Sequence, residues 1–224
     1  MKKLGVIYCF CLAACSSTPP PPDWQLNSRG ALERSISAYL SGNQRVEMAE
    51  FTRARSEVAS TGRIDAIART ELTRCAARVA SLVFEPCAGF ERLQADAAAP
   101  ERAYASYLAG KLTAGDAALL PEQHRGVVTS GVPSEAALAS IKEPLAKLIA
   151  AGVLFQTNRA SPAVVIQAID AASSQGWRRP LLAWLGVQAK LAEQAGDVAE
   201  AGRVKRRIAL VQEASMFSED RRAQ

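Results

Sequence analysis

Residues 64–82 read IDAIARTELTRCAARVASL, and this stretch decides the fold class. Its apolar side chains recur in steps of three or four residues, at Ile64, Ala68, Leu72, Cys75, Val79 and Leu82. Such spacing places side chains on one face of an α-helix. We therefore expect a helix that buries one face and carries Cys75 on that face.

The same spacing continues on both sides of this segment, while glycine and proline fall between the periodic stretches. No stretch alternates apolar and polar residues as a half-buried strand would. The sequence predicts an all-α fold, with antiparallel helical hairpins in a single bundle or a short repeat-like array. We expect eight helices, over residues 27–40, 44–60, 64–82, 100–112, 134–151, 162–175, 181–195 and 198–211.

Two helix starts have clear capping signals. Ser161 precedes Pro162, which combines an N-cap serine with proline in the first helical position. Asp197 is followed three residues later by Glu200, as in a capping box with aspartate at the cap. We expect a helix to begin at each place.

The first fifteen residues have the features of a signal peptide. Lys2 and Lys3 precede an apolar run over residues 4–12, which small residues follow. A transmembrane helix needs about 20 apolar residues, and this run is roughly half as long. The run therefore indicates export rather than a membrane span.

Leu12, Ala13, Ala14 and Cys15 together resemble the lipobox of bacterial lipoproteins. The resemblance implies removal of residues 1–14 and fatty acylation, including palmitate, at Cys15. Because Ser16 is not aspartate, the resemblance also implies the outer membrane. We expect the protein on the periplasmic face of that membrane. The alternative is a plain secretory signal with a chance cysteine.

We divide the chain into a signal peptide at residues 1–14, a lipidated cysteine and proline-rich tether at 15–23, and a helical domain at 24–224. The prolines at positions 19–22 favour an extended polyproline II segment. Such a segment would hold the domain away from the lipid headgroups. It is equally compatible with a disordered terminus that has no role.

The cysteine count predicts one disulfide. Cys9 and Cys11 lie in the leader and Cys15 is assigned to lipid, so Cys75 and Cys87 remain. Two thiols in an oxidising compartment usually pair. The chain between them is long enough to turn back along the helix. Two free buried thiols, or a redox or metal pair, are the alternatives.

The segment QAGDVAEA at residues 194–201 resembles the central turn of a tetratricopeptide repeat. Ser41, Gly42 and Asn43 have a similar arrangement before a helix with Phe51 and Ala54. This sequence departs from the repeat signature because Glu47 replaces the close-packing alanine and no 34-residue period links the two turns. The resemblance implies a repeat-like helical body.

Composition and motifs exclude several function classes. The chain has 27 basic and 22 acidic residues, and without residues 1–14 the formal charge falls from +5 to +3. No concentrated basic motif indicates nucleic-acid binding. His124 is the only histidine, and we expect it to be a solvated side chain in the non-periodic stretch 114–133. We assign no catalytic, cofactor-binding or metal-binding residue.

We expect a lipid-anchored interaction or assembly module with a protein partner in the cell envelope. Candidate contacts are Trp177, Arg178 and Arg179 in one patch and Arg203, Arg206 and Arg207 on the last helix. Core packing of Trp177 and an ordinary solvated helix face are the alternatives. A different function would be a cell-wall enzyme that uses carboxylates, with Glu85 as its acid.

Replacing Cys15 with serine should abolish incorporation of labelled palmitate, because lipidation of a lipobox requires the thiol. Metabolic labelling of both proteins, followed by immunoprecipitation, measures this. Continued labelling of the Cys15→Ser variant would show that the lipobox interpretation is wrong.

Overall fold

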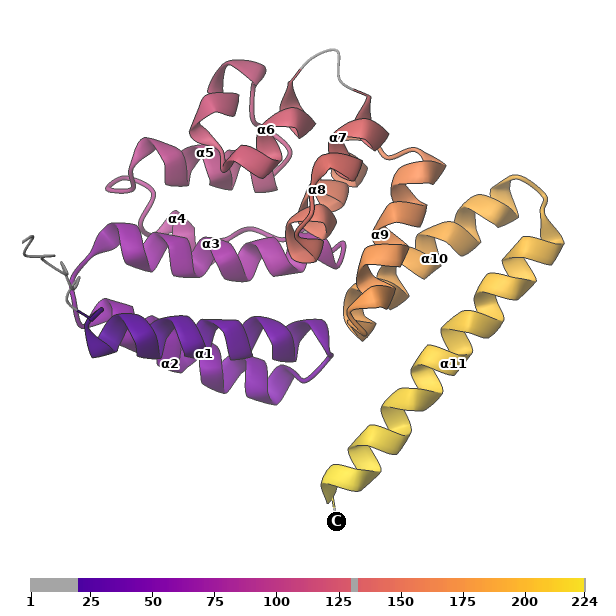
Figure 1. Cartoon of the computed structure of the whole chain (residues 1–224), viewed down its shortest axis with the longest axis horizontal. Coiled ribbons are helices and arrows are strands. Elements are labelled where there is room, and N and C mark those ends of the chain that lie inside the picture. The colour runs from indigo at the N-terminus through magenta and orange to yellow at the C-terminus, as the bar shows by residue number, and fades with distance from the viewer. Residues whose placement is uncertain (1–19, 130–132, 224) are drawn as a thin grey trace, which may run out of the picture.

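The computed structural model is all-α, as the periodicity predicts (Figure 1). It describes residues 20–129 and 133–223, with side chains described as far as Glu213, so the prediction for Cys15 lies outside the described residues. In that part of the chain there are no strands. Its elements are α1 (Asp23–Leu40), α2 (Gln44–Ala59), α3 (Ile64–Ala80), α4 (Ala88–Glu91), α5 (Ala99–Leu108), the 3₁₀ helix η1 (Ala114–Leu119), α6 (Glu122–Val128), α7 (Ser134–Ser140), α8 (Pro144–Gln156), α9 (Pro162–Ser174), α10 (Arg178–Gln194) and α11 (Val198–Ala223).

The structure has more helices than the eight we expected. The segment 134–151 is divided into α7 and α8, because Pro144 cannot continue a helix and instead occupies the first position of α8, which Glu143 caps. The stretch 114–133, predicted as a loop, contains η1 and α6. Helix α3 ends at Ala80 because Leu82 adopts a positive φ of 58°.

Both capping predictions are confirmed, one of them in part. The Ser161 side chain accepts a hydrogen bond from the backbone N–H of Val164 at the start of α9. Asp197 Oδ1 accepts from the N–H of Glu200 at 2.9 Å. The reciprocal bond of a capping box is not made, since the Glu200 carboxylate binds Gln188 and Arg203 instead.

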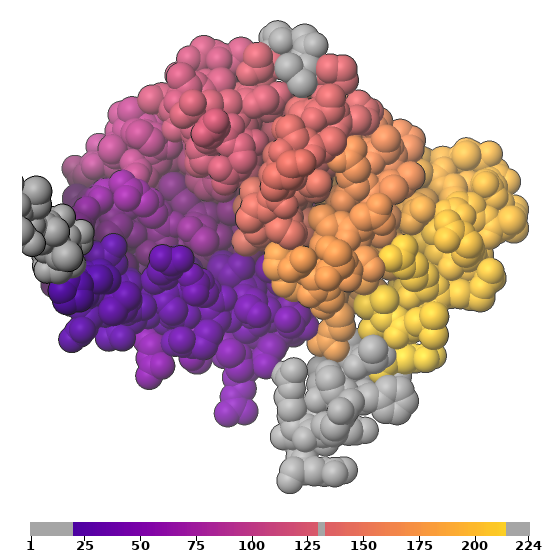
Figure 2. Space-filling view, viewed as in Figure 1, coloured from indigo at the N-terminus to yellow at the C-terminus, as the bar shows by residue number. Residues whose placement is uncertain are grey.

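Helix α3 packs against the α1–α2 hairpin, α4, α5 and α8. Helices α1 and α2 form a hairpin along one side of it, α5 lies on the opposite side, and α8 packs against it (Figure 1). Leu72, Ala76, Val79 and Ala80 of α3 are buried in the main core. Helix α11 stands at one edge of the molecule beside α10 (Figure 2).

Helices α3 and α8 approach each other closely at Gly152. A Cβ atom on Gly152 would lie 2.3 Å from the carbonyl oxygen of Val79. Next to this contact, Trp184 of α10 donates from Nε1 to the carbonyl oxygen of Ala80 at 3.1 Å. The Trp184 ring also meets Phe155 edge-on, with 5.8 Å between centroids. One end of α3 therefore fixes both α8 and α10.

We predict that Gly152→Ala destabilises the protein by about 1–3 kcal/mol, because the helices must separate to admit the methyl group. Gly186→Ala is the matched control. Gly186 is exposed in α10 and a Cβ there would meet nothing within 4 Å. This substitution should stabilise the protein by up to about 1 kcal/mol through helix propensity. Urea unfolding of both variants measures the difference, and shifts of the same sign would contradict the proposed close contact.

Candidate functional site

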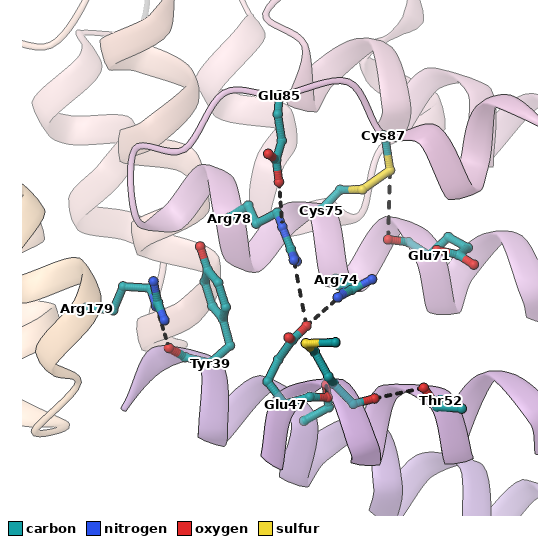
Figure 3. Close-up of polar contacts among 12 residues, drawn as sticks. Tyr39, Glu47, Thr52, Glu71, Arg74, Cys75, Arg78, Glu85, Cys87 and Arg179 are labelled. Carbon is teal, nitrogen blue, oxygen red and sulfur yellow. Dashed lines mark hydrogen bonds and ion pairs between the residues drawn. A yellow bond between two sulfur atoms is a disulfide. The ribbon is translucent and has the colours of Figure 1, made fainter. Parts of the chain in front are cut away.

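A buried ion cluster joins α2 to α3 (Figure 3). Glu47 has 2% of its surface exposed. Its Oε1 accepts from Arg74 Nε at 2.7 Å and lies 3.8 Å from Arg78 Nη2. Arg74 also covers the Phe51 ring, and Arg78 covers that of Tyr39. A buried carboxylate is costly without such partners, so these two arginines hold the α1–α2 hairpin against α3.

The cluster continues from Arg78 to the segment that follows α3. Arg78 lies between Glu47 and Glu85 and donates from Nε to Glu85 Oε1 at 2.7 Å (Figure 3). The Glu85 side chain is 54% exposed. Glu85, which the cell-wall-enzyme alternative names as its acid, is therefore exposed to solvent and paired with a cation. The structure gives the enzymatic alternative no support at this residue.

Cys75 and Cys87 form the predicted disulfide, with their Cα atoms 5.9 Å apart. The bond turns residues 81–87 back along α3, as the chain length between the cysteines allows. Because Arg78 binds Glu85 in the same segment, a covalent bond and an ion pair hold it at two points (Figure 3).

A hollow of about 570 Å³, which we call the disulfide groove, opens beside this bond. Its walls come from α3, the pinned segment, α4, α5 and the end of α8. Leu72, Val79 and Phe90 supply buried apolar surface. Arg102 and Lys111 supply cations, and Glu85 and Glu91 supply carboxylates. The groove thus offers both apolar and charged contacts, and it is the candidate functional site.

Phe84 is the most prominent apolar side chain at the groove. It is 39% exposed, and its ring stacks on Phe155 with 6.3 Å between centroids. Our sequence analysis did not predict Phe84, Arg102 or Lys111 as site residues. In the sequence, the proximity of Phe84 to Cys87 was the available sign that Phe84 lies at this site. Arg102 of α5 and Lys111, which follows α5, are brought to the groove only by tertiary packing.

His124 is not the solvated loop residue that we expected. It lies in α6, is buried, and shares a 3.2 Å hydrogen bond between Nδ1 and the hydroxyl of Tyr107. The rings of Tyr104 and Tyr107 lie 5.9 Å and 5.1 Å from the imidazole. Burial lowers the pKa of His124 to about 4 and raises that of both tyrosines. This arrangement keeps the imidazole neutral inside the core.

The arginines of the first predicted contact patch bind backbone atoms of this same chain. Arg178 donates to the carbonyl oxygen of Ser41 from Nε at 3.2 Å and from Nη2 at 2.7 Å. Arg179 donates to the carbonyl oxygen of Tyr39 at 2.8 Å and covers its ring. Trp177 is partly buried against the core, which agrees with the packing alternative. These three residues dock α10 onto the end of α1.

The second predicted patch is more open. Arg203 is exposed and binds Glu200, with 2.6 Å between Nη2 and Oε1, and this ion pair raises the pKa of Arg203. Arg207 donates to Ser173 Oγ at 3.2 Å. Arg206 is exposed. A partner contact at Arg203, Arg206 and Arg207 stays a prediction.

Within residues 20–129 and 133–223, no three His, Cys, Asp or Glu side chains gather as a metal site would require. No helix in those ranges combines the length and apolarity needed to cross a bilayer. Comparison of the chain with protein families, curated proteins and solved structures finds no match in any of the three.

The buried imidazole predicts a pH dependence of stability. An unfolded chain has a histidine pKa of about 6.5, so it binds more protons than the folded chain between about pH 6.5 and pH 4. The free energy of unfolding should therefore fall as the pH is lowered through this window, by at most about 1.4 kcal/mol per pH unit from this residue.

The His124→Gln variant should lack this contribution. We expect the stability of the wild type relative to the variant to decrease by about 2–3 kcal/mol between pH 7 and pH 4. Urea unfolding of both proteins at each pH measures this. A difference that stays constant with pH would show that the imidazole is not held neutral in the folded state.

Proposed function

We propose that this chain is a lipid-anchored envelope protein that binds a partner segment in the disulfide groove and acts as a helical interaction module. The proposed anchor is Cys15, on the basis of the lipobox-like sequence, and the proposed place is the periplasmic face of the outer membrane. The proposed partner is another envelope protein.

The observation that carries the proposal is an open, partly apolar groove, one wall of which is held in place at two points. The disulfide fixes one wall to α3, and the Arg78–Glu85 ion pair fixes the same wall a second time. A wall that is already ordered loses little conformational entropy on binding. Helical grooves with apolar floors and polar rims suit peptide segments and amphipathic helices.

The side chains of the groove suggest what the partner segment presents. Phe84 offers an exposed aromatic surface, and Lys111 adds an exposed cation. An apolar residue flanked by a carboxylate would match both features. Lipid anchoring would raise the effective concentration of the module near partners on the same membrane, so a modest affinity would suffice.

The test is a pull-down of the lipidated protein from cross-linked envelopes. Phe84→Ser should reduce recovery of the partner, whereas Leu26→Ser, which alters another exposed apolar side chain on α1, should not. Lys111→Glu should also reduce recovery of the partner. Lys190→Glu on α10 is the control for charge reversal and should not reduce it. We expect at least about a fivefold loss for each groove variant, equivalent to about 1 kcal/mol.

Urea unfolding of the four variants separates a binding defect from a folding defect, because Phe84 also packs on Phe155. Equal recovery with groove and control variants would argue against this groove as the binding site. Failure to recover any partner with the folded wild type would argue against the interaction module itself.

A further inference from the structure

A second hollow, which we call the Glu101 cleft, lies along a different face of α5 from the disulfide groove. It has a volume of about 600 Å³ and shares Leu72 with the groove. Its walls come from α3, the start of α5 and the turn between η1 and α6. The cleft therefore brings together three parts of the chain that are separate in sequence.

Most of the wall is apolar. Leu72 and Leu120 are buried, Leu119 is partly exposed, and the Tyr104 ring also lines the cleft. Pocket walls of this kind bind the apolar body of a ligand, while a few polar groups fix its orientation. Of the cleft's Arg69, Thr73 and Glu101, only Glu101 is buried.

Glu101 has an unusual environment for a carboxylate. Its side chain is 5% exposed. Its Oε1 accepts from Arg69 Nε at 2.8 Å, but Oε2 is buried and has no hydrogen-bond partner among the described residues. Buried polar atoms are nearly always hydrogen-bonded, since leaving a carboxylate oxygen without a partner is costly. Oε2 is thus an unpaired acceptor of a residue that lines the cleft, and a donor that reached it would supply the missing hydrogen bond.

The cation next to Glu101 lies largely in solvent. The Arg69 side chain is 66% exposed, and it also lies 3.5 Å from Asp65, which binds Arg63 at 2.8 Å. Charges in solvent are strongly screened, whereas the Glu101 carboxylate is surrounded by apolar walls. A charged donor that reaches Oε2 would make a short, charge-assisted hydrogen bond where screening is weak.

We propose that the Glu101 cleft binds a ligand that carries an ammonium or guanidinium group on an apolar stem. The cation donates to Glu101 Oε2, and the stem packs against Leu72, Leu119 and Tyr104. The same chemistry occurs in a free alkylamine and in a lysine or arginine side chain of a polypeptide. This site is separate from the disulfide groove and does not depend on the function proposed for it.

The first experiment titrates the folded protein with n-butylammonium, n-butylguanidinium and the neutral analogue n-butanol. Binding is followed by NMR shifts of the backbone amides at residues 98–104 and 119–121. We expect saturable binding of both cations, at least about tenfold tighter than that of n-butanol. Equal binding of all three probes, or no saturable shift with either cation, would overturn the proposal.

Glu101→Gln keeps the size of the side chain but removes its charge. We expect this variant to bind both cations about tenfold more weakly, while binding of n-butanol is unchanged. Glu213→Gln, at an exposed carboxylate of α11, is the matched control and should bind as the wild type does. Unchanged cation binding by Glu101→Gln would refute a role for the carboxylate.

A second variant keeps the proposal testable if Glu101→Gln unfolds. Leu119 is partly exposed at the cleft, so Leu119→Lys should fold and bring a competing ammonium group to the site. We expect it to lose most of its affinity for both cations. Full affinity in a folded Leu119→Lys variant would count against the proposed position of the ligand.

The source of the ligand is distinguished by two short peptides. One has arginine between alanines, with both ends blocked, and the other has citrulline in its place. Tighter binding of the arginine peptide than of n-butylguanidinium would indicate a polypeptide ligand. Equal or weaker binding would indicate a free amine, provided that the citrulline peptide binds more weakly than the arginine peptide. If both peptides bind alike, recognition of a cation is refuted.

Discussion

The lack of a side chain at Gly152, where a Cβ atom would collide with the carbonyl oxygen of Val79, allows α8 to lie close against α3. This close packing bears on the contacts of α10 and on the disulfide groove. Beside this contact, Trp184 donates to the carbonyl oxygen of Ala80, and its ring meets Phe155 of α8. Phe155 in turn supports Phe84 beside the disulfide groove. The groove therefore depends on a packing distance set at a glycine that does not line it.

Charge performs a second structural task in this fold. Where a tetratricopeptide-like hairpin would place a small residue, the chain has Glu47, and α3 supplies Arg74 and Arg78 to meet it. Burial of ions is weak evidence for added stability, but separating a buried carboxylate from its cations costs about 3–5 kcal/mol. We interpret Glu47 as a determinant of register, because any other alignment of the α1–α2 hairpin would leave a buried carboxylate without cations. Arg78 also binds Glu85, so the same arginine connects Glu47 with the segment that follows α3.

Long periodic segments were predictable from sequence, and so was the disulfide, because α3 shows its buried face over more than four turns and only Cys75 and Cys87 remained to pair. Helix α6 was not, since its seven residues span about two turns and cannot establish a period. His124 was consequently assigned to a loop.

The docking of Arg178 on Ser41 and of Arg69 on Glu101 joins residues 137 and 32 positions apart, respectively. Local patterns carry no information on such contacts, which is why both hollows beside α5 were missed.

The start of α1 at Asp23 limits where a protein anchored at Cys15 could work. Eight residues, 15–22, would separate the acylated cysteine from the rigid body. Even a fully extended chain of that length covers only about 26–29 Å. Under the proposed anchoring, the start of α1 would stay within that distance of the acylated cysteine. A binding partner would therefore have to come close to the membrane surface, because the short tether would not let the domain reach structures deeper in the periplasm.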